Sequence, residues 1–362
     1  MRTGRVLSII ATTAAMLFYI ATAQAQACTP TGFYRDGVNM TAAVIASGDI
    51  SGGIIDATGC NIGIYYGPGT SGTVDGVTVR NANYFGILVA GDIENADGSF
   101  SNPGATSVDI TNSTISKIGE NPFNGDQHGV SIYYHAFAPG SSATGAVSGN
   151  MISAYQKGGI VVNGPGSAVS VSGNTVRGNG PVDYIAQNGI QIGYGATGQV
   201  MRNEVTGNSY TGPGLASSAG ILIFGGCQEY FGNFPLTTGV QVVKNIVGSS
   251  TPDDGNDMGV ALANYDPTCS TKPMTPTNNK VINNTITNDE VTNTSGNGAP
   301  NEGYQAGVYD SGVNDKIINN DISGVGYSTP PGSCAVVTNG TETCSIDTNS
   351  STAAKVHANS VP

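Results

Sequence analysis

Polar side chains, some of them able to transfer protons, precede a repeated Gly-Ile or Gly-Val pair in several parts of the chain. His128, Lys157 and Gln187 hold this place in successive repeats, and Asp126 and Tyr184 lie near them in sequence. β-Elimination from a uronic acid needs one group that neutralises the carboxylate and another that removes the C5 proton, and a Lys or His near a Tyr could supply them. These five residues are therefore our catalytic candidates. The alternative is that they are solvated turn residues, with His128 bonded to the backbone.

Side chains after each Gly-Ile or Gly-Val pair alternate between inward and outward positions, as in a strand. The outward positions include Tyr133, Gln191 and Phe224 among small and apolar residues. Such a face either offers a flat surface on which sugar rings stack or is covered by loops. We take these three residues as candidate substrate-binding residues and keep the covered face as the alternative.

Clustered acidic residues suggest a cation site. Asp253, Asp254 and Asp257 surround a glycine and an asparagine in the stretch DDGND, and a second acidic stretch runs from Asp92 to Asp97. Carboxylate and amide oxygens are the ligands that Ca²⁺ prefers. The spacing is not that of an EF-hand, so a possible Ca²⁺ site at Asp253, Asp254 and Asp257 competes with an ordinary solvated loop.

Two columns of residues recur along the chain with a period of about 24 to 48 residues. The first has an Asn three residues after one Val or Ile and two before another; its Asn positions are 150, 174, 203, 245, 284 and 320, with Ser113 at the same place in an earlier repeat. The second is Gly followed by Val or Ile; its Gly positions are 86, 129, 159, 189, 220, 259 and 307. The columns alternate strictly.

One repeat is too short to bury its own apolar side chains, but stacked repeats share an apolar interior. The turns leave no room for helices, so equivalent strands pair in parallel, and stacked Asn side chains satisfy backbone groups at a bend. The sequence predicts an all-β, single-stranded, right-handed parallel β-helix over residues 54–326. We expect an N-terminal cap at 28–53 and an irregular C-terminal tail at 327–362. Longer repeats predict protruding loops at 91–106, 225–239, 249–257, 264–279 and 288–305.

The phrases Gly173-Asn174-Thr175-Val176 and Asn188-Gly189-Ile190-Gln191-Ile192-Gly193 resemble the right-handed parallel β-helix repeat of the pectate-lyase-like superfamily. The resemblance covers about three quarters of the chain. It implies the fold and, together with the general hand of parallel crossovers, its handedness. The activity motifs of the lyases, polygalacturonases and epimerases in that superfamily are missing, so the resemblance implies no particular reaction.

Residues 1–27 have the features of a secretory signal peptide: two arginines, an apolar run and small residues before Cys28. A lipoprotein acylated at Cys28 is the alternative. No later stretch is apolar enough to span a membrane, and we expect a secreted or extracytoplasmic protein.

The six cysteines of an exported chain predict disulfides. The preferred pairs are Cys28 with Cys60, Cys227 with Cys269, and Cys334 with Cys344. A zinc site is the alternative, but no CxxC or Cys/His spacing supports it.

The formal charge of the chain is −12, and removal of the signal peptide leaves 11 basic and 25 acidic residues, a charge of −14. Nucleic acid and anionic membranes are unexpected partners of such a chain, and a polyanionic polysaccharide would need a bridging cation or a local basic cluster. We expect a protein that binds or acts on extracellular polysaccharide as a lyase or hydrolase. The alternative is a non-catalytic surface, adhesion or structural β-helix.

Overall fold

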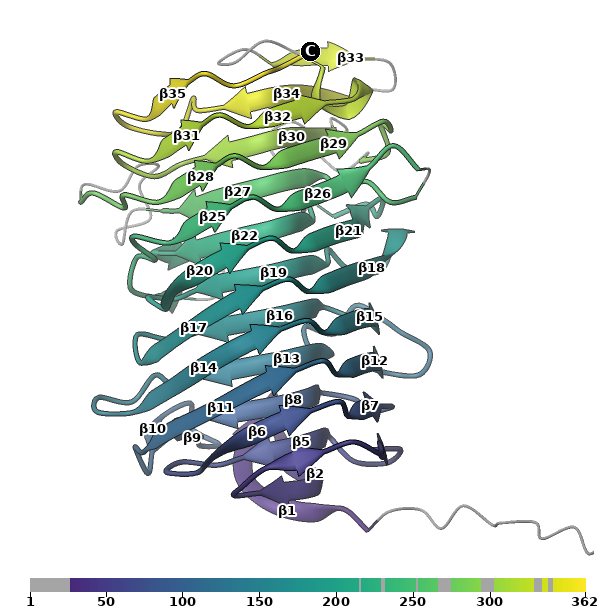
Figure 1. Ribbon diagram of the computed structural model, residues 1–362, viewed down its shortest axis with the longest axis vertical. Helices are drawn as coiled ribbons and strands as arrows, with labels where there is room; N and C mark the ends of the chain where they lie inside the picture. Colours follow the sequence, from purple (N-terminus) through teal and green to yellow (C-terminus); the bar gives the residue numbers. More distant parts are fainter. Residues whose placement is uncertain are drawn as a thin grey trace, which may run out of the picture.

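The computed structural model describes residues 27–214, 216–228, 232–251, 253–265, 275–293, 303–328, 334–337 and 341–362. Within these residues the chain winds as a tall solenoid with its N-terminal coils at one end and its C-terminal coils at the other (Figure 1). Each regular coil contributes one strand to each of three long sheets, which we call sheets A, B and C. No helix in this part of the chain is long and apolar enough to cross a membrane.

Sheet A is parallel except at its two edges, where β1 and β33 are antiparallel to their neighbours. Its strands in spatial order are β1 (Thr29–Arg35), β2 (Val38–Ala46), β5 (Ile62–Tyr66), β8 (Phe85–Ala90), β13 (Val130–His135), β16 (Gly158–Asn163), β19 (Asn188–Gly193), β22 (Ala219–Gly225), β27 (Met258–Asn264), β30 (Gly303–Asp310), β34 (Thr341–Asp347) and β33 (Ala335–Val337).

Sheets B and C are parallel throughout their described strands. Sheet B contains β3 (Ile50–Ser51), β6 (Ser71–Asp75), β11 (Ala105–Thr111), β14 (Ser142–Ser148), β17 (Ser167–Ser172), β20 (Thr197–Met201), β25 (Gln241–Val243), β28 (Lys280–Ile282), β31 (Lys316–Ile318) and β35 (Lys355–His357). Sheet C contains β4 (Ile54–Asp56), β7 (Thr78–Arg80), β12 (Thr114–Ile118), β15 (Met151–Tyr155), β18 (Thr175–Val182), β21 (Glu204–Tyr210), β26 (Ile246–Ser249), β29 (Thr285–Asn288) and β32 (Asp321–Ser323). A single 3₁₀ turn is described, at Val325–Tyr327.

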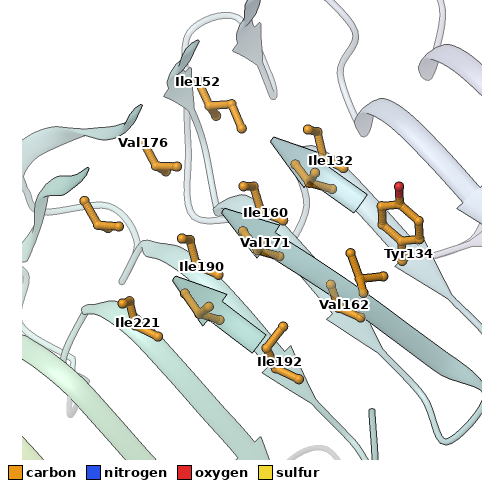
Figure 2. Close-up of a cluster of buried hydrophobic side chains, with 14 of the residues drawn as sticks. Ile132, Tyr134, Ile152, Ile160, Val162, Val171, Val176, Ile190, Ile192 and Ile221 are labelled. Atoms are coloured by element: carbon orange, nitrogen blue, oxygen red, sulfur yellow. The ribbon is translucent and has the colours of Figure 1, made fainter. Parts of the chain in front are cut away.

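The interior is a continuous stack of Val and Ile side chains from all three sheets (Figure 2). In sheet A, for example, Ile132, Ile160, Ile190 and Ile221 lie opposite one another on neighbouring strands. All four are fully buried. Because burial of each such side chain contributes about 1.5–3 kcal/mol, the shared interior is the main stabilising element. The predicted Gly-Val/Ile column is confirmed with one shift: Ser131-Ile132, rather than Gly129-Val130, is in register with Gly86-Ile87.

The predicted Asn column forms a hydrogen-bonded ladder at the corner between sheets B and C. Asn203, for example, accepts hydrogen bonds from the backbone N–H and the side-chain amide of Asn174, and it donates to Asn245 Oδ1 and to the Val171 carbonyl. The ladder runs through Ser113, Asn150, Asn174, Asn203, Asn245, Asn284, Asn320 and Asn359. Backbone groups that the bend removes from the sheets are thus satisfied inside the protein.

The solenoid continues beyond the predicted boundary at residue 326. β34 pairs in parallel with β30, and β35 pairs in parallel with β31. Asn359 extends the ladder from Asn320. Residues in the expected irregular tail therefore form a further coil, because Val356, Asn359 and Val361 repeat the spacing of the Asn column.

The two described disulfides each lie beside an antiparallel edge strand of sheet A. Cys28, just before β1, is bonded to Cys60, and Cys334, just before β33, is bonded to Cys344 in β34. Both predicted pairs are confirmed. Cys269 of the third predicted pair and residues 1–26 of the expected signal peptide lie outside the described residues. Residues 40–46, within the expected N-terminal cap, belong to strand β2.

Replacement of one central ladder residue tests the role of the Asn column. Asn203→Ala leaves the buried N–H of Asn174 and the Val171 carbonyl without partners, so we expect a loss of about 1–3 kcal/mol in the free energy of unfolding. Asn359→Ala is the matched control at the end of the ladder, where the side chain is half-buried, and it should cost less. Chemical denaturation of both variants measures the difference, and equal losses would contradict the argument.

Candidate functional site

The five predicted catalytic residues lie near the corner between sheets C and A, but they do not form one cluster of reactive groups. Gln187 is fully buried; its side chain accepts from the Asn179 N–H and donates to the carbonyls of Tyr155 and Gln156. These contacts fix the backbone of the turn. These backbone contacts give Gln187 a structural role and leave its side chain no free group for catalysis.

Lys157 and Tyr184 also have local partners. Lys157 Nζ donates to the Ala186 carbonyl at 2.8 Å, and desolvation lowers the pKa of Lys157 to about 8. The Tyr184 hydroxyl accepts from the Asn179 side chain at 3.1 Å. Burial raises the pKa of Tyr184, so less of its hydroxyl is ionised and able to act as a base at neutral pH.

His128 has a carboxylate partner that the sequence did not reveal. Its Nε2 lies 2.9 Å from Glu120 Oε1, and its ring stacks on Tyr84 with a centroid distance of 3.9 Å. His128 is 6% exposed, whereas the Glu120 side chain is 33% exposed. Glu120 thus connects the buried histidine to the surface. Asp126, in the same loop, is exposed and accepts from the Asn124 side chain.

Gln156 positions the loop that carries Glu120 and His128. Its side-chain carbonyl accepts from the N–H groups of Glu120 and Asn124, and its amide donates to Asn124 Oδ1 and the Asp126 carbonyl. Its position in the sequence does not identify Gln156, because it lies three residues before Gly159, whereas Gln187 lies two residues before Gly189. Gln305, two residues before Gly307, makes similar contacts with the loop before it.

A pocket of about 620 Å³ opens beside Glu120. It is built from the end of β12 and from the turns that follow β4, β7 and β12 in successive coils, so it extends along the axis of the solenoid. The lining combines amides, a hydroxyl, one carboxylate, one ammonium group and one aromatic ring. Its residues are Thr58, Gly59, Asn81, Asn83, Lys117, Gly119, Glu120, Asn121 and Phe123. Asn83 Nδ2 is 3.5 Å from Glu120 Oε1, and this is the oxygen atom that also contacts His128 Nε2.

The three predicted substrate-binding residues lie on the outer face of sheet A. Tyr133 is only 3% exposed and stacks on Phe85. Gln191 and Phe224 are half-buried, and Gln191 donates to Asn163 Oδ1. Tyr133 therefore fits the alternative in which loops cover this face of sheet A. Among the described residues, it does not offer an open surface on which a sugar ring could stack.

A buried contact between an aspartate and a histidine anchors the loop that covers this face. Asp92 Oδ1 lies 2.9 Å from His135 Nε2, and neither side chain is exposed. Asp92 Oδ2 accepts from the N–H groups of Phe137 and Ala138 and from the Ser141 hydroxyl. Burial alone would raise the pKa of Asp92, but the bonds from His135 and the other donors outweigh it and hold this pKa below its usual value. The loop carries the antiparallel hairpin β9 (Ile93–Glu94) and β10 (Phe100–Ser101).

The candidate calcium ligands are not gathered around one point. Asp254 pairs with Arg177 at 2.8 Å, while Asp257 is fully buried and accepts from the N–H groups of Tyr210 and Ser218. Burial raises the pKa of Asp257 to about 7. Asp253 is exposed. Among the described residues, these three carboxylates are not a group whose ligand atoms converge as a metal site requires.

The comparisons with known proteins bear on the fold. A family model described as a right-handed beta helix region matches residues 36–231, more than half of the chain. No match is found among curated proteins or among solved structures.

Asp310 and Asp315 form another acidic pair, and its position is fixed by hydrogen bonds within the protein. Asp310 Oδ1 accepts from the Gly312 N–H, and Asp315 Oδ1 accepts from the Thr277 hydroxyl and the Asn279 N–H. The remaining oxygens are buried without a hydrogen-bond donor among the described residues, and the two carboxyl groups interact with each other. Burial and the neighbouring charge raise the pKa of Asp310 to about 8, so a proton held between the two groups satisfies both.

This pair makes stability depend on pH. Because the folded pKa of Asp310 lies above its unfolded value of about 4, the folded state holds more protons, and stability falls as pH rises from about 4 to about 8. Asp310→Asn removes this titration, so its free energy of unfolding should fall less over that range. The exposed Asp289→Asn is the control and should follow the parent protein. Identical profiles for Asp310→Asn and the parent would contradict this assignment.

Proposed function

Because the chain belongs to the right-handed beta-helix family, we propose that it binds an extracellular polysaccharide and that the pocket beside Glu120 is the binding site. The observation that carries the proposal is the lining of this pocket. Amide, hydroxyl, carboxylate and ammonium groups from three turns surround one aromatic ring, Phe123. The family fold alone indicates no ligand.

The lining suits a sugar in both its polar and its apolar parts. Sugar hydroxyls donate and accept hydrogen bonds, and the side chains of Asn81, Asn83 and Asn121 can also do both. The ring of Phe123 is half-buried and offers an apolar surface to the C–H face of a sugar ring. A site with an apolar contact and a few placed polar groups is typical of small-ligand pockets.

The shape of the pocket favours a chain over a single small molecule. Its residues come from three consecutive coils, so neighbouring contacts repeat along the solenoid axis. The volume of about 620 Å³ lies within the range of roughly 300–1,000 Å³ that ligand pockets occupy. An extended segment of a few sugar residues is the ligand that we propose.

Binding is better supported than catalysis. Glycosidases place two carboxyl groups on either side of the bond that breaks, whereas Glu120 is the one carboxylate among the residues that line this pocket. Should the protein also act on its ligand, Glu120 with His128 at 2.9 Å is the pair that could transfer a proton. Lyase or hydrolase activity remains a prediction.

Two substitutions in the pocket test the proposal. Phe123→Ala removes the apolar contact and Asn83→Ala removes one amide, and we expect each to weaken binding at least tenfold in Kd. The measurement is calorimetric titration with oligosaccharides that a panel of neutral and uronic-acid glycans identifies as ligands of the parent protein.

Phe100→Ala removes an exposed phenyl ring from the β9–β10 hairpin, which contributes no residue to the pocket, and should leave Kd unchanged. Thermal unfolding establishes that each variant is folded. If no glycan in the panel binds the parent protein, or if the pocket variants bind as well as the parent, the proposal fails, and a non-catalytic surface or structural protein becomes the better interpretation.

A further inference from the structure

Three lysines form a column on the outer face of sheet B near the C-terminal end of the solenoid. Lys280 in β28 lies opposite Lys316 in β31, which lies opposite Lys355 in β35. The next residue of each strand, Val281, Ile317 or Val356, packs into the interior. The lysines therefore point outward. Lys355 is exposed, and Lys280 and Lys316 are half-buried.

Like charges that face one another on neighbouring strands destabilise a sheet. The strands lie about 4.8 Å apart, so each lysine has another positive charge as its nearest neighbour in the column. None of the ion pairs among the described residues includes any of the three lysines. Asp315 precedes Lys316, but its carboxyl group is buried with Asp310 and Thr277.

Further positive charges lie on the coils that precede the column. Strands β25, β28, β31 and β35 have the sequences QVV, KVI, KII and KVH, with no acidic residue. Exposed Arg202 and Lys244 follow β20 and β25 at the adjacent corner. We call the outer face of these four strands, with Lys280, Lys316 and Lys355, the strip. In a chain with a formal charge of −12, the strip is a local basic cluster of the kind that binding of a polyanion requires.

The outer face beside the lysines is apolar. Val243, Ile282 and Ile318 form the next outward column and are half-buried. A ligand that lies along the axis would thus meet positive charges on one side and apolar side chains on the other. The sugar rings of an anionic polysaccharide carry both negatively charged substituents and apolar C–H faces. The strip strands contain no Phe, Tyr or Trp on which nucleic-acid bases could stack.

We propose that the column of Lys280, Lys316 and Lys355 binds an anionic polysaccharide, whose repeated carboxylate or sulfate groups lie along the solenoid axis opposite successive strands. This strip is separate in the sequence from the pocket beside Glu120. It deepens the proposed function, on which it rests for polysaccharide as the ligand class, by adding a second contact surface that selects negative charge.

The experiment measures binding of the mature protein to immobilised alginate, dextran sulfate and uncharged dextran over a range of salt concentrations. The test variant carries Lys280→Gln, Lys316→Gln and Lys355→Gln together. We expect its affinity for at least one of the two anionic polymers to fall at least tenfold and to depend less on salt, because three charge contacts are lost. The matched control replaces the same three lysines by Arg, keeps the charge and should bind as the parent does.

Stability provides an independent readout. Removal of three mutually repelling charges should leave Tm unchanged or raise it at low salt, so a loss of binding does not reflect unfolding. The proposal is overturned if the Gln variant keeps its affinity and salt dependence, or if the parent binds duplex DNA but neither anionic polymer. Self-association of the parent that the Gln variant loses, without polymer binding, would also overturn it in favour of a second copy of the chain.

The pocket variants separate this inference from the proposed function. Phe123→Ala and Asn83→Ala should reduce binding of oligosaccharides in the pocket and leave the salt-dependent part of alginate or dextran sulfate binding in place. Loss of pocket binding in these variants with retained strip binding supports both sites. If the parent protein binds an anionic polymer through the lysine column but its pocket binds no glycan, the proposal for the lysine column is supported and the proposal for the pocket fails.

Discussion

The parallel register between coils is the constraint on which the rest of the structure depends. Every coil meets its neighbour through backbone hydrogen bonds, so a side chain at one position lies directly against its equivalents above and below. Such stacking favours residue types whose side chains interact favourably with identical side chains on the neighbouring strands. Val and Ile do so inside the solenoid, and Asn does so at the corner because its side chain both donates and accepts. The ladder from Ser113 to Asn359 and the apolar interior are two consequences of one geometry.

The same constraint makes charged residues informative. A charge placed in a column must find a partner, be buried as a neutral group, or face a like charge. Asp254 pairs with Arg177, and Asp310 and Asp315 are brought together at a corner where burial raises their pKa values. Lys280, Lys316 and Lys355 face like charges. A column of like charges stands out against a fold that otherwise satisfies its stacked groups, and so it points to a ligand outside the chain.

The repeated part of the fold was predictable, because its signal is periodic. Asn174 and Ile190 each belong to a column whose spacing identifies its partners in other coils. Prediction failed where the period changed. The extra residues before β13 shifted the expected Gly129-Val130 pair out of register, and Ser131-Ile132 took its place. The last coil was missed although Val356, Asn359 and Val361 repeat the motif, because no Gly-Val or Gly-Ile pair accompanies them.

The candidate site could be predicted less well for the same physical reason. Residues in the loop after β12 have no equivalents in other coils, so no column reveals that Glu120 meets His128 or that Gln156 holds both in place. The position before a repeated glycine places these residues at the corner between sheets C and A but does not give the direction of each side chain, and Gln187 bonds to the backbone. Residues that repeat maintain the solenoid, whereas a pocket arises where one turn departs from its neighbours. In this family of folds the departures from the repeat, such as the loop with Glu120 and Phe123, are where specific binding is to be sought.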